Sequence, residues 1–274
     1  MYSKTSKRTT TCRRSTPPFN QQMKNGRLPR AACLNRNFNF EAMIVEVILA
    51  ILAAAVQFIP HMLDRIDKWS YRRKFIQQNQ EYIKQVEEAD AKYHPERPDV
   101  ELAQKCKEYL SEVFPYGVES KTQNMSQEEL IEFFRQLEKG AEQIMGVNVN
   151  ANFYAAPDQP AINKLCGFYH HETNTLHINA VFILSGDPKL VEEQVYTIFH
   201  ELKHARQWAA IEGYLYSTHD FGYSEQQIRE WATNFDHYIP SFVDDEWYQK
   251  QPVENDAFGF ESILKGERQF EVIG

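Results

Sequence analysis

The chain is poor in cysteine, and the few cysteines that it has are far apart. They are Cys12, Cys33, Cys106 and Cys166. The absence of a Cys-x-x-Cys pair excludes a zinc ribbon and a thioredoxin-like redox motif. A disulfide framework would need a higher density of cysteines in 274 residues, so a reducing compartment fits better. The chain also lacks an internal repeat, which excludes solenoids and propellers.

The main body of the chain lacks an excess of basic residues. The formal net charge is −8, but residues 1–42 carry nine Lys and Arg against a single acid, Glu41, so the remainder carries −16. A nucleic-acid-binding domain needs a basic face on its folded part, and we therefore expect no nucleic-acid partner. With 42% hydrophobic and 25% charged residues, the body has the composition of a globular protein.

Residues 1–42 form a basic tail without hydrophobic periodicity. Lys, Arg, Ser, Thr and Asn dominate it, a composition that favours disorder. The same composition resembles an organelle transit peptide, and a third interpretation is that translation starts at Met43. The sequence leaves these three interpretations open.

Residues 43–60 predict an apolar helix. The run 43–59 is interrupted only by Glu46 and Gln57 before Pro60. Its length is at the lower end for a membrane-spanning helix, which needs about 20 residues. The basic residues that follow would keep the downstream domain in the cytoplasm, whereas the basic tail argues for the opposite orientation. We expect a membrane anchor here, and a buried or self-associating helix is the alternative.

The remainder of the chain predicts an α+β fold. Residues 61–120 are expected to form a helical linker region, and a capping box at Ser126 predicts the start of a further helix. Alternating apolar and polar residues then predict a strand at 147–153 and a hairpin at 167–179. We therefore expect residues 121–274 to form one domain, with a small antiparallel sheet and a helical C-terminal part.

A long helix is predicted between Asp187 and Gly213. Asp187 is a suitable N-cap before Pro188, and Gly213 is a suitable stop. Between them, apolar residues recur at steps of four and three, which places them in one stripe. His200 and His204 lie nearly opposite that stripe, so the helix has a core face and a polar face that carries both histidines.

The sequence His200-Glu201-Leu202-Lys203-His204 has the spacing of a helical zinc site. Residues four apart lie one helical turn apart, so His200 and His204 can bind one zinc ion. Glu201 is offset by one residue and can reach a zinc-bound water without being a ligand. Zinc lowers the pKa of that water, and Glu201 acts as general base while the water attacks a carbonyl. The pattern predicts a zinc-dependent peptidase whose partner is a protein or peptide substrate.

A catalytic zinc site normally has a third protein ligand. The metzincin arrangement, with another histidine shortly after the motif, is disfavoured because no histidine follows His204 before His219. A glutamate on a following helix is the other common solution. The candidates are Glu225, Glu230 and Glu254. Glu225 and Glu230 lie on a helix predicted to open at Ser224, and Glu254 lies on a later one that begins with a proline followed by two acids. Asp256 on that later helix could then orient a ligand histidine.

Two segments of the chain resemble a known family. HELKHARQW and QPVENDAFGFE are similar to segments of the small gluzincin peptidases, including the ImmA/IrrE-type family. That family combines a helical HExxH motif, a preceding β-hairpin and a second helix with a Glu-x-x-Ala-x-x-Phe-like motif. Glu254, Ala257 and Phe260 match the second motif position by position. The resemblance covers residues 145–265 and implies a zincin-like fold with Glu254 as the third zinc ligand.

The chain departs from this family in its spacing, and this keeps alternatives open. The gap of 49 residues between His204 and Glu254 is longer than is usual, so Glu225 stays an alternative ligand. Candidates for polarising the scissile carbonyl are His219, His237, Tyr223 and Tyr248. Two other functions also stay open: a regulatory or toxin-like effector protease with one protein target, and a non-catalytic zinc-binding scaffold.

Overall fold

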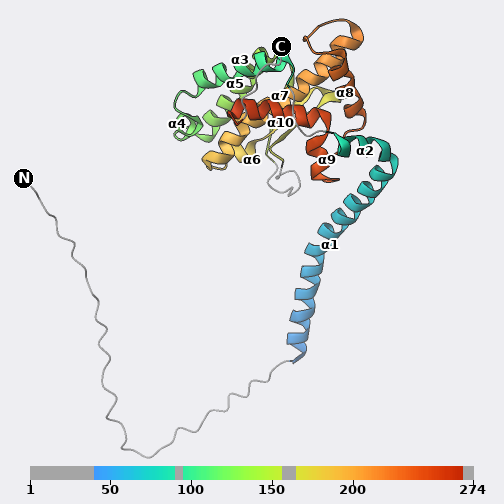
Figure 1. The fold of residues 1–274 in the computed structure, drawn as a ribbon. Coiled ribbons are helices and arrows are strands. Elements are labelled where there is room, and N and C mark those ends of the chain that lie inside the picture. Colours follow the sequence, from blue (N-terminus) through green and yellow to red (C-terminus); the bar gives the residue numbers. More distant parts are fainter. Residues whose placement is uncertain (1–39, 90–94, 156–164, 268–274) are drawn as a thin grey trace, which may run out of the picture. The chain divides into compact units, whose positions relative to one another are not determined.

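The computed structural model describes residues 40–89, 95–155 and 165–267 (Figure 1). The interpretations of residues 1–39 therefore lie outside the described residues. By its contacts the chain divides into two units, residues 1–58 and residues 59–274. The second unit holds the sheet and all helices from α2 onward.

Several of the described helices begin at a residue whose side chain caps them. The helices within the described residues are α1 (Phe40–Gln78), α2 (Gln80–Glu88), α3 (Arg97–Val113), α4 (Val118–Thr122), α5 (Gln127–Met145), α6 (Ala180–Ile183), α7 (Pro188–Tyr216), α8 (Glu225–Asp236), α9 (Asp245–Lys250) and α10 (Pro252–Lys265), with a 3-10 turn at His171–Thr173. The capping box at Ser126 is confirmed, because its hydroxyl and the Glu129 carboxylate each accept a backbone N–H of the other residue. Asp187 caps α7 by accepting the Lys189 N–H.

The described strands form one small mixed sheet. They are β1 (Asn150–Tyr154), β2 (Gly167–His170) and β3 (Thr175–Asn179), in the order β1-β3-β2. The predicted hairpin is confirmed, because β2 and β3 pair antiparallel around Asn174, whose φ is 48°. The prediction of an antiparallel sheet is wrong, because β1 pairs with β3 in parallel. The chain runs along β1, back along β2 and forward again along β3, and β3 occupies the middle. The fold is thus α+β, mostly helical, with a mixed sheet.

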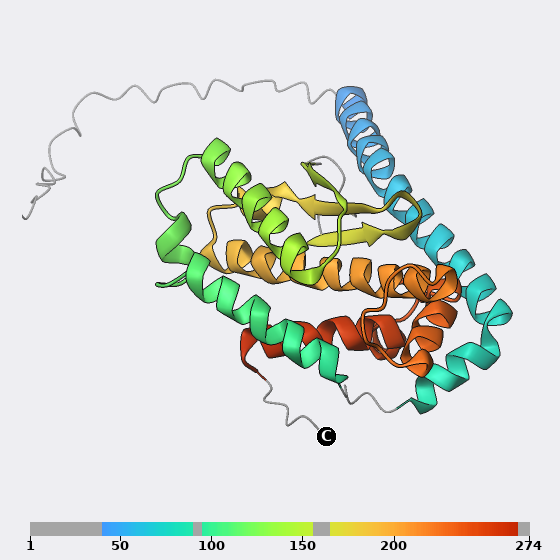
Figure 2. The same ribbon diagram turned by 90° about the horizontal axis from the view of Figure 1, so that it is seen from above.

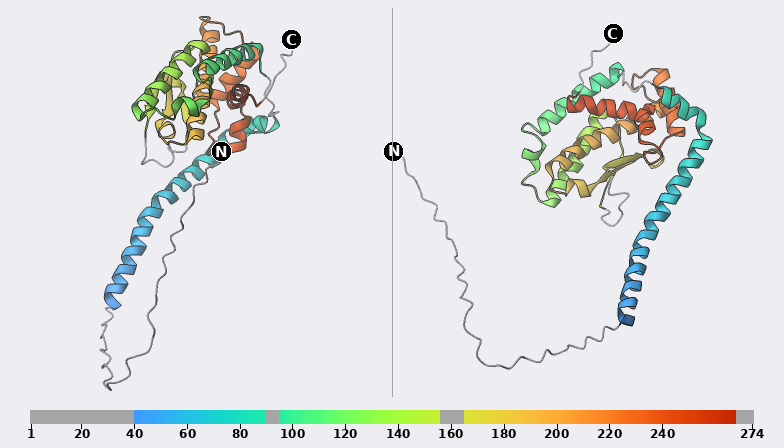
Figure 3. Two further views of the ribbon diagram at one scale, coloured as in Figure 1. Left: turned by 90° about the vertical axis from the view of Figure 1, so that its left-hand side faces the viewer. Right: turned by 60° about the horizontal axis from the view of Figure 1, so that its bottom comes forward.

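Helix α7 is the central element of the second unit. Its apolar stripe, which includes Val195, Ile198 and Leu202, is buried in a core shared with α5 and the sheet. Helix α10 packs along the opposite side of α7 (Figure 2), and the two helices again run side by side in the right-hand view of Figure 3. The polar face of α7, with His200 and His204, is therefore enclosed against α10.

Gly213 does not end α7, so this prediction is wrong. The helix continues to Tyr216, and Ser217 forms the left-handed cap with a φ of 53°. A Cβ at position 213 would collide with the backbone carbonyl of His219. The glycine is therefore explained by the close return of the chain after the helix, and not by helix termination.

Helix α3 lies in the region predicted as a helical linker, and it packs against α5 and α10. Leu102, Ala103 and Cys106 on its inner face are buried in the same core as α7. This upstream helix therefore belongs to the structure that surrounds the histidine motif.

The apolar run 43–59 forms the first part of α1. Most of its side chains lie outside the described residues, so the anchor stays a prediction. Within the part of the chain that the structure describes, no helix is long and apolar enough to cross a membrane.

Candidate metal centre

The site is formed where the start of α10 meets the middle of α7. Pro252 occupies the first turn of α10, where its missing N–H costs no hydrogen bond. This helix start is fixed to α8, because the buried Asn234 accepts the Val253 N–H at 2.8 Å and donates to Gln251 at 2.9 Å. Glu254, in the first turn, is thereby directed at α7.

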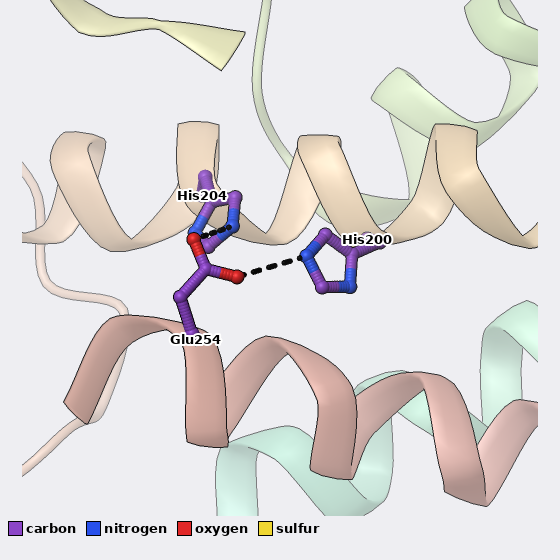
Figure 4. A group of neighbouring side chains, drawn as sticks. All are labelled: His200, His204 and Glu254. Carbon is purple, nitrogen blue, oxygen red and sulfur yellow. Dashed lines mark hydrogen bonds and ion pairs between the residues drawn. The ribbon is translucent and has the colours of Figure 1, made fainter. Parts of the chain in front are cut away.

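His200, His204 and Glu254 come together as the sequence analysis predicted (Figure 4). His200 Nε2 lies 3.3 Å from one carboxylate oxygen of Glu254, and His204 Nε2 lies 3.3 Å from the other. The potential ligand atoms of all three residues lie within 4.8 Å of one another, and all three side chains are buried. The group could therefore hold one metal ion.

These separations fit a tetrahedral ion. Bonds of about 2.0–2.1 Å in tetrahedral geometry place neighbouring ligand atoms roughly 3.3–3.4 Å apart. Each histidine already has one Glu254 oxygen at this distance, Oε2 for His200 and Oε1 for His204. Two imidazole nitrogens and one carboxylate also leave a fourth position for a further ligand.

Hydrogen bonds on the far side of each ring orient the two histidines. His204 Nδ1 lies 2.9 Å from Gln207 Oε1, and His200 Nδ1 lies 3.0 Å from the carboxylate of Glu261. Glu261 also pairs with Lys265 at 2.6 Å, which keeps it ionised and able only to accept. Each Nδ1 must therefore be the donor, and each Nε2 is left facing Glu254. This arrangement is typical of metal-binding histidines.

Charges in the site are strongly coupled. Burial alone would raise the pKa of Glu254, but His204 and His200 outweigh it and hold that pKa well below its usual range. Burial opposes the charge on His200, yet its hydrogen bonds with Glu254 and Glu261 raise the His200 pKa well above its usual value. The site therefore stabilises positive charge between the imidazoles and the carboxylate, which is the electrostatic requirement for a cation.

Glu201 lies beside this group and is not part of it. Its carboxylate is buried, and this burial raises its pKa above the usual value, while His200 lowers it. A hydrogen bond with the backbone of Tyr169 ties Glu201 to strand β2. The side chain is therefore placed between the metal group and the edge of the sheet.

The structure does not bring the alternative carboxylates to the site. Glu225 lies exposed on α8 and pairs with Arg229, and Glu230 accepts a hydrogen bond from Gln226 on the same surface. Of the three candidate third ligands, only Glu254 joins the histidines.

One of the four candidate carbonyl-polarising residues borders the site. Tyr248 interacts with Glu254, and burial raises the pKa of its phenol. Tyr223 instead contacts Asp99 and Lys203. His219 and His237 are not in the group either, since His219 packs on Phe221 and His237 Nδ1 faces Asn79.

Three residues near the site were not foreseen from the sequence. Tyr238 donates a hydrogen bond of 2.6 Å to Glu254, and Glu261 orients His200. Glu261 follows Glu254 by seven residues, so helical spacing could have found it. The third is Gln207, which stands between His204 and Asp256, the residue expected to orient a histidine.

Comparisons with protein-family models, curated proteins and solved structures found no match to this chain. Any assignment of function therefore depends on the geometry of the site itself.

Proposed function

We propose that the chain is a zinc-dependent peptidase with His200, His204 and Glu254 as metal ligands. The observation that carries this proposal is the convergence of these three buried side chains with Glu201 beside them. Two imidazoles and one carboxylate form a donor set typical of catalytic zinc. Magnesium and calcium prefer sites made of oxygen ligands alone.

The residues around the ion have separate roles in this proposal. Zinc, when bound, supplies a Lewis acid that activates water and polarises a carbonyl. Glu201 takes the proton from the attacking water and passes it to the leaving amine. Tyr248 and Tyr238 keep their phenolic protons because burial raises both pKa values. Tyr238 already donates its one phenolic proton to Glu254, so Tyr248 is the candidate hydrogen-bond donor to the reacting carbonyl.

An extended peptide fits the sheet edge next to Glu201. Strand β2 is an outer strand of the described sheet, with β3 on its other side. An outer strand offers unpaired backbone groups that can hydrogen-bond an extended segment. Because Tyr169 of this strand contacts Glu201, a peptide bound along it would pass the general base.

The first test is metal content together with peptide hydrolysis. The purified chain is expected to hold one zinc ion per molecule and to cleave an unfolded protein or a peptide library. A chelator should stop cleavage, and added zinc should restore it. A protein that holds zinc but cleaves nothing would support the scaffold alternative, and a protein that binds no zinc would overturn the proposal.

We also propose that α1 binds an anionic membrane surface. Ile59, Met62, Leu63, Ile66 and Trp69 form a stripe on this helix, and each is between 45% and 61% exposed. The basic residues of the same segment, Arg65, Lys68, Arg72, Arg73 and Lys74, outnumber its acids. An apolar stripe with a tryptophan and neighbouring basic residues is typical of helices that lie in the membrane interface.

Flotation with lipid vesicles tests this membrane proposal. The chain is expected to float with vesicles that contain anionic phospholipid and less with purely zwitterionic ones. The double variant Leu63→Glu, Ile66→Glu should lose flotation. The matched double variant Tyr116→Glu, Leu215→Glu replaces exposed apolar residues elsewhere with the same change in charge, and it should float normally. Equal flotation of both variants would contradict the proposal, and a change confined to the oligomeric state would assign the stripe to a second copy.

A further inference from the structure

Lys203, inside the histidine motif, is fully buried. Its ammonium lies 2.6 Å from Asp99 of α3 and 2.9 Å from Asp256 of α10. It is surrounded by aromatic rings, with those of Tyr223 and Trp231 centred 4.9 Å away. A charge in such a place is strongly destabilising unless it is paired. Lys203 and the two aspartates therefore form one buried charge cluster.

A chain of hydrogen bonds connects this cluster to the metal group. Asp256 accepts a hydrogen bond of 2.6 Å from Gln207 Nε2, and the same nitrogen donates to the Val253 carbonyl at 3.0 Å. The other end of the amide, Gln207 Oε1, lies 2.9 Å from His204 Nδ1. The path thus runs from α3 through Lys203 and α10 to a metal ligand on α7.

The two acceptors of Gln207 fix which way its amide points. If the amide were turned over, its oxygen would face the Asp256 carboxylate and the Val253 carbonyl, and both contacts would become repulsive. The nitrogen must therefore face them, and the oxygen must face His204. This leaves His204 Nδ1 as the donor and frees the Nε2 lone pair for the metal side of the ring.

We propose that Lys203 and Asp99 are positioning residues that, through Asp256 and Gln207, hold His204 in its metal-binding tautomer. This inference rests on the proposed metal site. Lys203 holds Asp256 in place through its contact of 2.9 Å with the oxygen that accepts from Gln207, and Asp99 holds the Lys203 ammonium from its other side. Asp99 lies 104 residues before Lys203 in the chain, and it acts on the metal group without contacting it.

The central variant is Gln207→Leu, which removes the amide without adding charge. Loss of an orienting partner typically weakens metal binding about 10- to 100-fold, and we expect a loss of this size for zinc in competition with a chromophoric chelator. Gln194→Leu is the matched control, because Gln194 is equally buried on α7 and its amide has no hydrogen-bond partner among the described residues. The control should bind zinc like the wild-type chain.

A second measurement separates positioning from general loss of structure. In the metal-free protein labelled with ¹⁵N-histidine, the Nδ1–H proton of His204 should give a slowly exchanging NMR signal. This signal should disappear in Gln207→Leu and weaken in Asp99→Asn, while Gln194→Leu retains it. Unchanged zinc affinity and an unchanged His204 signal in Gln207→Leu would overturn the inference. If the wild-type chain binds no zinc, the proposed function fails, and the NMR signal still tests the positioning role.

Discussion

Replacing Glu201 with glutamine is expected to abolish peptide hydrolysis and to leave the zinc content unchanged. Glutamine has nearly the same shape but cannot take a proton from the attacking water, and a positioned general base contributes about 100- to 10,000-fold to the rate. Glu201 is not one of the grouped ligands, so the ion should stay bound. The comparison requires kcat on one peptide and metal analysis of the same preparation.

Glu212→Gln is the control for this variant. Glu212 lies exposed on the same helix, and the exchange removes the same charge outside the site. Its cleavage rate should equal that of the wild-type chain. If Glu201→Gln kept a wild-type rate, Glu201 would not be the base, and the peptidase mechanism proposed above would be wrong.

Glu254→Ala is expected to reduce zinc affinity by more than the roughly 10- to 100-fold that loss of an orienting partner causes. The carboxylate is a proposed direct ligand, and it also balances the charge of the two histidines that face it. Its removal leaves two imidazoles, an incomplete set for a catalytic site. Competition with a chelator and a thermal unfolding curve of the metal-free protein measure the two effects separately.

Glu225→Ala distinguishes between Glu225 and Glu254 as the third metal ligand. Glu225 is exposed and paired with Arg229, so its removal should change zinc affinity little. An exposed ion pair of this kind contributes little to stability. Loss of zinc in Glu225→Ala, with retention in Glu254→Ala, would contradict the assignment of the third ligand.

The parts of the site that could be predicted are those set by local rules. The spacing of His200 and His204 and the helix starts at Asp187 and Pro252 depend on neighbours within one or two helical turns. These signals located α7 and α10. The motif around Glu254 then indicated the third residue of the group, and the structure brings all three together.

The parts that could not be predicted depend on contacts between distant segments. Alternation showed where β1 lies but not its direction, because direction depends on which strand takes the middle of the sheet. Asp99 carries no local signal, since its partner Lys203 is 104 residues away. Gly213 satisfied a local rule for helix ends, but the return of the chain at His219 was the actual reason for a glycine.

The separation of the site along the chain has a consequence for when it can form. Helix α7 carries both histidines and can fold from local contacts, but Glu254 lies 54 residues after His200. Contacts that close long loops form late, after local helices. A chain still emerging from the ribosome would therefore display the two histidines without their carboxylate. In the proposed peptidase, the metal group would stay incomplete until residue 254 had been synthesised and packed against α7.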